Sequence, residues 1–171
     1  MGFGVKTTMI SENLRSMLND LVNMEFFSGY LYLSFSVHLK ELGLDGFNNW
    51  TRHKAKNEVE HGLNLFDFLM YKRHLVTLNK IQPPSLKCDS LLNLFLNIKQ
   101  HENSIKNFLK NIIYLAQKDE CKDILIILDD ILAQHNNDID FLSNLTKQLT
   151  KFDCDKNIIK LLNAELIDLI K

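Results

Sequence analysis

The sequence predicts an all-α protein, a four-helix bundle with one long crossover connection and a short fifth helix at the C-terminal end. Three observations predict this fold. Apolar residues recur at spacings of three and four along most of the 171-residue chain, strand-like alternation is absent, and the two prolines are adjacent at positions 83 and 84. A chain of this length suits one domain with a sizeable core. We therefore expect a single domain over residues 1–171.

The first two helices are expected over residues 10–41 and 47–72. The segment ELGLDG between them carries two glycines, which suit a helix end followed by a turn. Because this turn is short, the two helices should be antiparallel neighbours. Their inward stripes are Leu14, Leu18, Leu21, Ser28, Tyr32, Phe35 and Leu39 in the first helix, and Trp50, Ala55, Gly62, Leu65, Phe66 and Leu69 in the second.

A long irregular connector over residues 73–89 precedes two further helices, expected over 90–117 and 120–150. The connector spans about 55 Å when extended, so it can return along the whole bundle and leave the second and third helices parallel. A short fifth helix is expected over 156–170. The stripes of the third and fourth helices are Leu91, Phe95, Ile98, Ile105, Leu109, Ile112 and Ala116, then Ile124, Leu128, Ile131, Leu142, Leu145 and Leu149.

Composition and charge exclude several classes of function. Apolar residues make up 46% and charged residues 24%, as in ordinary soluble proteins, and a formal net charge of −1 gives no basis for nucleic-acid binding. No window has the apolar run of a membrane span or a signal peptide. Cys88, Cys121 and Cys154 lack metal-ligand spacing and suit isolated thiols in a reducing compartment. We expect a cytoplasmic protein without nucleic-acid or membrane partners.

Polar residues interrupt the apolar stripes of all four long helices, near the middle of each helix. Burying four carboxylates together is very unfavourable unless positive charge is buried with them. Two divalent cations would balance four carboxylates, and two neutral imidazoles would complete the ligand set. Carboxylate and imidazole together suit iron, manganese or zinc. The six residues predict a dimetal site in the bundle core and are Glu25, Glu58, His61, Glu102, His135 and Asp138.

Each interruption also has a simpler interpretation. A single polar residue on a bundle seam is usually a core group with a hydrogen-bond partner. The pair Glu58 and His61 has a spacing that is common on exposed helix faces. The segment around His135 would equally suit a solvated stretch with Asp138 turned outward. The dimetal interpretation depends on all six residues being in phase on four helices.

Three segments resemble the ferritin family, and the resemblance covers nearly the whole chain. NMEFFSGYLY (23–32) is similar to the first ferritin helix, AKNEVEHGLNLFDFL (55–69) to the second, and KQHENSIK (99–106) to the third. The resemblance implies a ferritin-like bundle of the bacterial, non-haem type. Such proteins oxidise Fe²⁺ with dioxygen or peroxide and store the Fe³⁺ mineral in a hollow homo-oligomer of twenty-four subunits, in which the fifth helix lines the four-fold channels.

The resemblance also implies roles for individual residues. Glu25 would be a metal ligand, His61 a terminal ligand, Glu58 the bridging carboxylate and Glu102 the ligand from the third helix, and these four would act with Tyr32 as catalytic residues of a diiron centre. Tyr32 would lie beside the centre and either hydrogen-bond a ligand, supply an electron, or act only as a packed aromatic.

Several positions depart from the family pattern. Val59 stands where bacterioferritins have their haem-binding methionine, so no haem is expected. His135 and Asp138 carry the two ligand types in reversed order, and we expect the second iron to bind Glu58, Glu102 and some combination of these two. The positions that match the acids of a third iron site lack a carboxylate and are Asn57, Gln134 and Asn137.

Two other functions remain compatible with the sequence. One is a rubrerythrin-like dimetal oxidoreductase that stores nothing. The other is a shell subunit without ferroxidase activity, which would follow if His135 and Asp138 point away from the core.

Overall fold

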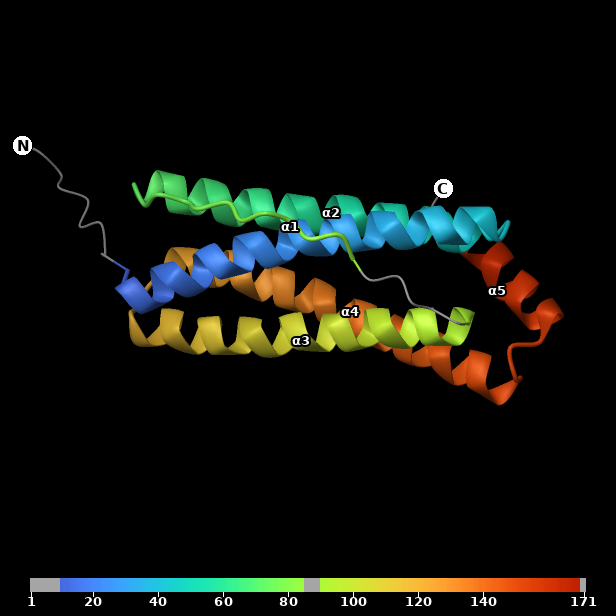
Figure 1. Cartoon of the computed structure of the whole chain (residues 1–171). Coiled ribbons are helices and arrows are strands. Elements are labelled where there is room, and N and C mark those ends of the chain that lie inside the picture. Colours follow the sequence, from blue (N-terminus) through green and yellow to red (C-terminus); the bar gives the residue numbers. More distant parts are fainter. Residues whose placement is uncertain (1–9, 85–89, 170–171) are drawn as a thin grey trace, which may run out of the picture.

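The computed structural model of the chain describes residues 10–84 and 90–169, and five helices and no strand lie within these ranges (Figure 1). The predicted all-α fold is confirmed. The predicted thiol Cys88 and the two chain ends, 1–9 and 170–171, lie outside the described residues. No helix of the described part is both long and apolar enough to cross a membrane. The helices are α1 (Glu12–Glu41), α2 (Asp45–Tyr71), α3 (Leu91–Lys118), α4 (Lys122–Lys151) and α5 (Lys156–Leu169).

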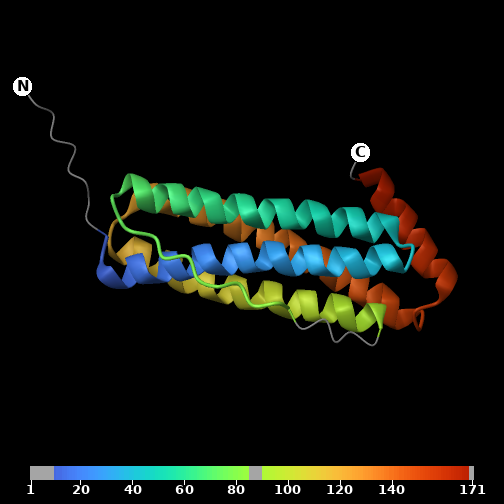
Figure 2. The ribbon, with the colours of Figure 1, turned by 45° about the horizontal axis from the view of Figure 1, so that its top comes forward.

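The connection between α2 and α3 is the crossover that sets the topology. Its described part, which ends at residue 84, runs back along the outside of the bundle, and α2 and α3 point in the same direction (Figures 1 and 2). Side chains of α1 hold it in place. Asn19 accepts a hydrogen bond from the backbone of Thr77 at 2.8 Å, and Asn23 accepts one from the backbone of Asn79 at 2.7 Å. Specific hydrogen bonds at Thr77 and Asn79 therefore hold this described part of the connector against α1.

The hydrophobic core is divided into two clusters by the middle level of the bundle. One cluster gathers the first half of α1 and the second halves of α2 and α3 with the start of α4; it includes Leu18, Leu21, Leu65, Leu69, Ile105, Leu109, Ile124 and Leu128. The other lies toward the opposite end and includes Phe35, Leu39, Phe47, Trp50, Phe95, Ile98, Leu142, Leu145 and Leu162. In every long helix, the polar residues that interrupt the apolar stripe lie between the two clusters.

The short helix α5 lies across one end of the bundle and caps the start of α2. No side chain of the residue before α2 caps that helix. Instead, Asn163 Oδ1 accepts hydrogen bonds from the backbone N–H groups of Gly46 at 2.9 Å and Phe47 at 3.2 Å. The contact requires glycine at position 46, because a Cβ there would lie 1.9 Å from the carbonyl oxygen of Asn163. A residue from the C-terminal helix thus satisfies amides that a helix leaves free at its first turn.

Replacement of Asn163 by Ala is expected to lower stability. The loss of a capping oxygen costs about 1 kcal/mol, which corresponds to a decrease of about 2–4 °C in the melting temperature of a chain of this size. Thermal unfolding followed by circular dichroism would measure the change. Lys160→Ala on the exposed face of α5 is the matched control and should leave the melting temperature unchanged; equal melting temperatures for the two variants would contradict the capping role.

Candidate metal centre

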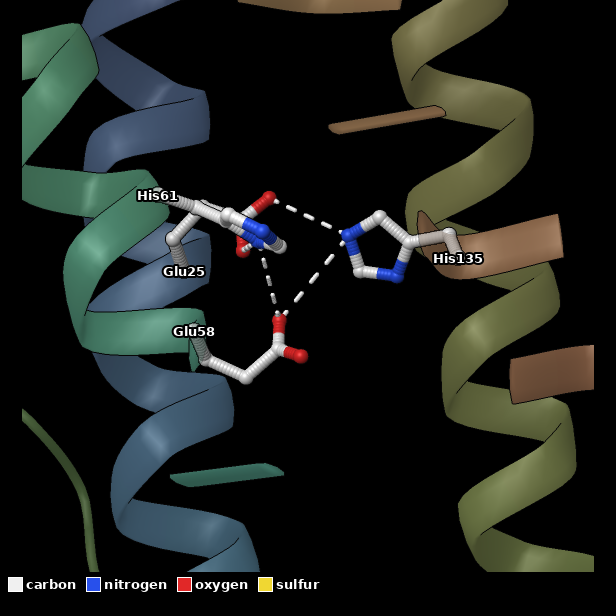
Figure 3. A group of neighbouring side chains, drawn as sticks. All are labelled: Glu25, Glu58, His61 and His135. Carbon is white, nitrogen blue, oxygen red and sulfur yellow. Dashed lines mark ion pairs between the residues drawn. The ribbon is translucent and has the colours of Figure 1, made fainter. Parts of the chain in front are cut away.

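Four side chains from three helices meet between the two hydrophobic clusters. Glu25 comes from α1, Glu58 and His61 come from α2, and His135 comes from α4 (Figure 3). Each offers one ligand atom, and these atoms all lie within 4.8 Å of one another. All four residues are at most 3% exposed. In Figure 3, His135 approaches from the side opposite to the other three, so the group closes around a common centre.

The distances within this cluster suit a bound metal ion. His61 Nδ1 lies 3.4 Å from Glu25 Oε2 and 3.8 Å from Glu58 Oε2. His135 Nε2 lies 3.5 Å from Glu25 Oε1 and 3.8 Å from Glu58 Oε2. These contacts are too long for good hydrogen bonds. Ligand atoms about 2.1 Å from a tetrahedral metal ion lie about 3.4 Å apart, which is close to the observed separations.

The same atoms lack hydrogen-bond partners. Among the described residues, the buried side-chain nitrogen and oxygen atoms without a partner are both carboxylate oxygens of Glu25 and of Glu58, together with His61 Nδ1 and His135 Nε2. Leaving even one buried polar atom unpaired is costly, and here all six belong to one cluster. The cluster therefore fits a cation that all four side chains bind.

The close approach of α1 and α2 brings Glu25 and His61 together. Gly62 follows His61 directly, and a Cβ at this position would lie 2.7 Å from the ring of Phe26, the residue after Glu25. The absence of a side chain on Gly62 lets the Phe26 ring pack directly against α2. The i,i+3 spacing on α2 then places Glu58 on the same face as His61.

Both imidazole rings are held by hydrogen bonds on the nitrogen that faces away from the centre. His61 Nε2 lies 3.1 Å from Gln134 Oε1 and donates to it, because an amide oxygen only accepts. His135 Nδ1 lies 2.6 Å from Glu102 Oε2. Such partners orient the ring of a metal-binding histidine and make the opposite nitrogen a better ligand. The geometry therefore presents His61 Nδ1 and His135 Nε2 to the same centre.

Glu102 and Tyr32 form the next layer. The Tyr32 hydroxyl donates a 2.5 Å hydrogen bond to Glu102 Oε1, and both side chains are buried. Burial, reinforced by the charge of Glu102, raises the pKa of Tyr32 well above its usual value, so the phenol keeps its proton. Tyr32 also contacts Trp50 edge to face at 5.9 Å between ring centroids. Tyr32, Glu102 and His135 thus form a continuous hydrogen-bonded chain that ends at the centre.

Asp138 lies outside the group of four. Its carboxylate forms an ion pair with the ammonium group of Lys54, and its side chain is 14% exposed. Lys54 Nζ also lies 3.4 Å from Glu58 Oε1, so this lysine joins Asp138 to the edge of the cluster.

The charges of the cluster shift the pKa values of its members. Burial is the largest influence on His61 and lowers its pKa, but Glu25 and Glu58 outweigh burial and raise the pKa to about 10. Burial likewise lowers the pKa of His135, and Glu102, Glu25 and Glu58 raise it to about 11. For Glu25, burial raises the pKa, but His135 and His61 bring it down to about 2. Without metal, His61 and His135 are therefore imidazolium groups at neutral pH, and their charges offset part of the negative charge of the carboxylates around them.

The structure thus places the six residues singled out in the sequence at one level, but in different roles. Four form the cluster, Glu102 orients His135, and Asp138 pairs with Lys54. Sequence reasoning missed Lys54 altogether and treated Gln134 only as a missing acid. A signal for Lys54 existed, since it lies four residues before Glu58 and hence on the same face of α2.

Comparison with protein families identifies a known domain in this chain. The family model described as "Ferritin-like domain" matches residues 15–152. The bacterial non-heme ferritin of Staphylococcus epidermidis is 25% identical over 158 residues, covering 92% of this chain and 95% of the relative. The corresponding protein of Staphylococcus aureus is 23% identical over the same coverage.

Solved structures show the same relationship. The open pore ferritin of the hyperthermophilic archaeon Archaeoglobus fulgidus superimposes with a TM-score of 0.86 at 27% identity, covering 94% of this chain and 98% of that one. A structure described as a humanized archaeal ferritin gives a TM-score of 0.86 at 26% identity, with 92% and 97% coverage. Fold and sequence therefore agree over nearly the whole length.

Proposed function

The chain belongs to the ferritin family, and on this premise we propose that it stores iron and that its buried cluster oxidises Fe²⁺ to Fe³⁺. Family and fold support iron storage. The observation that supports a metal-oxidising centre is that six buried ligand atoms on Glu25, Glu58, His61 and His135 have no hydrogen-bond partner. Iron is the substrate here, and a mixed carboxylate and imidazole set is suited to it.

Under this proposal, the first Fe²⁺ binds to the group of four. A second Fe²⁺ would bind to the other oxygen of Glu58, to Glu102 and to Asp138, in place of their present partners. Two Fe²⁺ ions give one electron each to dioxygen, which takes up two protons and leaves as hydrogen peroxide. Anionic carboxylates favour the trivalent product, because the electrostatic attraction grows with the charge of the ion.

The protein's own residues prepare the site for this reaction. Gln134 and Glu102 hold the two imidazole rings in the orientation that binds metal. Binding of metal requires His61 Nδ1 and His135 Nε2 to release their protons. The hydrophobic clusters above and below the site exclude bulk water, which strengthens the electrostatic interactions within it. The Tyr32 hydroxyl donates a hydrogen bond to Glu102 Oε1 and so helps to hold that carboxylate beside His135.

We further propose that the protein forms a homo-oligomeric shell of twenty-four chains with the mineral inside. The support is the ferritin-like bundle together with α5, which docks at one end of it in the manner expected of a channel-lining helix. The finer proposal of ferroxidase activity does not depend on this assembly, since the cluster lies within one chain.

Size and iron content test the function together. Twenty-four chains of 19.9 kDa would elute at about 480 kDa on a sizing column, and Fe²⁺ added in air should be oxidised rapidly and co-elute as Fe³⁺ with the protein. A dimer that oxidises iron but retains none would instead support a rubrerythrin-like oxidoreductase. A shell that takes up iron only at the rate at which Fe²⁺ oxidises in buffer without protein would support a storage subunit without ferroxidase activity.

A further inference from the structure

A buried lysine lies among the carboxylates of the metal centre. Lys54 is 4% exposed, and its ammonium group forms an ion pair with Asp138 while lying 3.4 Å from Glu58 Oε1. Lysine is almost never fully buried unless it is paired. Its partners here are two carboxylates from different helices, α2 and α4. The chain therefore carries a cation of its own at the level where metal ions are expected.

The two oxygens of Glu58 face different cations. Oε2 lies 3.8 Å from both His61 Nδ1 and His135 Nε2, on the side of the four-residue cluster. Oε1 lies on the side of Lys54. Figure 3 shows this division, since one oxygen of Glu58 meets the dashed lines and the other has none. A carboxylate that bridges two metal ions uses one oxygen for each, and Lys54 faces the second oxygen.

We propose that the Lys54 ammonium occupies the second cation position of this centre, so that one divalent ion binds tightly to the cluster and a second binds only when Lys54 leaves Asp138. The inference deepens the proposed function and rests on it. Lys54 would make the second site conditional on a high concentration of metal.

The charges of the site support this order of binding. Glu25, Glu58, Glu102 and Asp138 supply four negative charges, which two divalent ions would cancel. Lys54 already contributes one positive charge that its buried position keeps close to Glu58 and Asp138. A second divalent ion would therefore face a neighbouring ammonium at short range in a medium of low dielectric constant, which is strongly repulsive. The first ion binds on the Oε2 side of Glu58, where the neighbouring ligand atoms belong to Glu25, His61 and His135 and none belongs to Lys54.

A consequence follows for the proposed reaction. Reduction of dioxygen by two electrons needs both iron ions at once. If the second ion must displace Lys54, oxidation will depend on iron concentration more steeply than binding of the first ion does. The centre would then hold a single ion at low iron and oxidise pairs of ions when iron is abundant.

Titration of the metal-free protein with Zn²⁺, which has no redox chemistry, tests the inference. Isothermal calorimetry should show one tight Zn²⁺ per chain in the wild type. Lys54→Gln, which removes the charge but keeps a hydrogen-bond donor for Asp138, should bind two, with the second affinity increased at least about tenfold. Lys54→Arg keeps the charge and should still bind one. Lys56→Gln, an exposed change on the same helix, is the matched control and should bind one.

The outcomes separate this inference from the proposed function. Two equally tight Zn²⁺ ions in the wild type, or a single ion in Lys54→Gln, would overturn the role of Lys54 and leave the proposed function intact. No tight Zn²⁺ in the wild type would overturn both. If Lys54→Gln does not fold, a crystal structure of the wild type at saturating Zn²⁺ tests the inference instead. A second zinc at Glu58 Oε1 with Lys54 still paired to Asp138 would contradict the inference, and a displaced Lys54 would support it.

Discussion

Glu58→Gln is expected to abolish the fast phase of Fe²⁺ oxidation, slowing it by about a hundredfold or more, since loss of a supporting partner alone costs a metal site 10–100-fold. The change keeps the shape of the side chain but removes its charge. Glu58 lies within ion-pair distance of His61, His135 and Lys54, so no other carboxylate in the site contacts as many members. Stopped-flow absorbance of the Fe³⁺ product would measure the rate.

The matched control for this variant is Glu60→Gln, two residues further along α2 and exposed to solvent. It removes the same charge from the same helix and should oxidise Fe²⁺ like the wild type. A fast phase that survives in Glu58→Gln would show that oxidation takes place elsewhere in the protein. Tight binding of Zn²⁺ should be lost together with the fast phase, which distinguishes a failure of binding from a failure of electron transfer.

Affinity for metal is expected to increase steeply with pH. In the metal-free protein the pKa values of His61 and His135 are raised to about 10 and about 11, so both rings carry a proton at neutral pH and both must lose one when metal binds. Release of two protons makes the apparent affinity increase about a hundredfold for each pH unit between about pH 6 and 8. Zn²⁺ calorimetry at several pH values, in buffers of different ionisation enthalpy, would count the protons.

His135→Gln should reduce this pH dependence of the affinity to about tenfold per pH unit, because only His61 then releases a proton when metal binds. His53→Gln, at an exposed position of α2, should keep the full dependence. Release of fewer than one proton by the wild type would contradict the assignment of charged imidazoles to the metal-free centre.

The stability of the metal-free protein should show a different pH profile. Histidines with raised pKa values stabilise the fold fully below their ordinary pKa of 6.5, and this contribution is lost as the pH rises through about 10 and 11. Glu25, whose pKa falls from 4.5 to about 2, contributes above its ordinary pKa and loses the contribution as the pH falls toward 2. The two effects place the greatest stability of the metal-free chain between about pH 4.5 and 6.5, where its metal affinity is lower.

Helix periodicity explains how much of the architecture could be predicted. An apolar stripe with a repeat of three and four residues defines which face of a helix is buried, and a polar residue within the stripe is therefore placed in the core. This reasoning located Glu25, Glu58 and His135 between the two hydrophobic clusters, where the structure has them. The crossover could be predicted as well, because only a long connector leaves α2 and α3 parallel.

Periodicity could not predict which polar groups pair with each other. His135 and Asp138 lie three residues apart and leave the same face of α4, yet the two side chains turn to different partners. Asp138 forms an ion pair with Lys54, which is 84 positions away in the chain. The spacing of four residues places Lys54 on the same face of α2 as Glu58, but a lysine stem is flexible and usually reaches solvent, so the spacing alone does not predict that this ammonium group stays inside. Direct binding of metal by Glu102 and Asp138 stays a prediction.

The bonds that Asn163 accepts from the opening turn of α2 also bear on biosynthesis. Asn163 is synthesised 117 positions after Gly46, and a domain generally folds as a unit. While the ribosome still holds the tail, these two amides have only water to bind. Closure of this end of the bundle therefore depends on α5, the last helix to be synthesised.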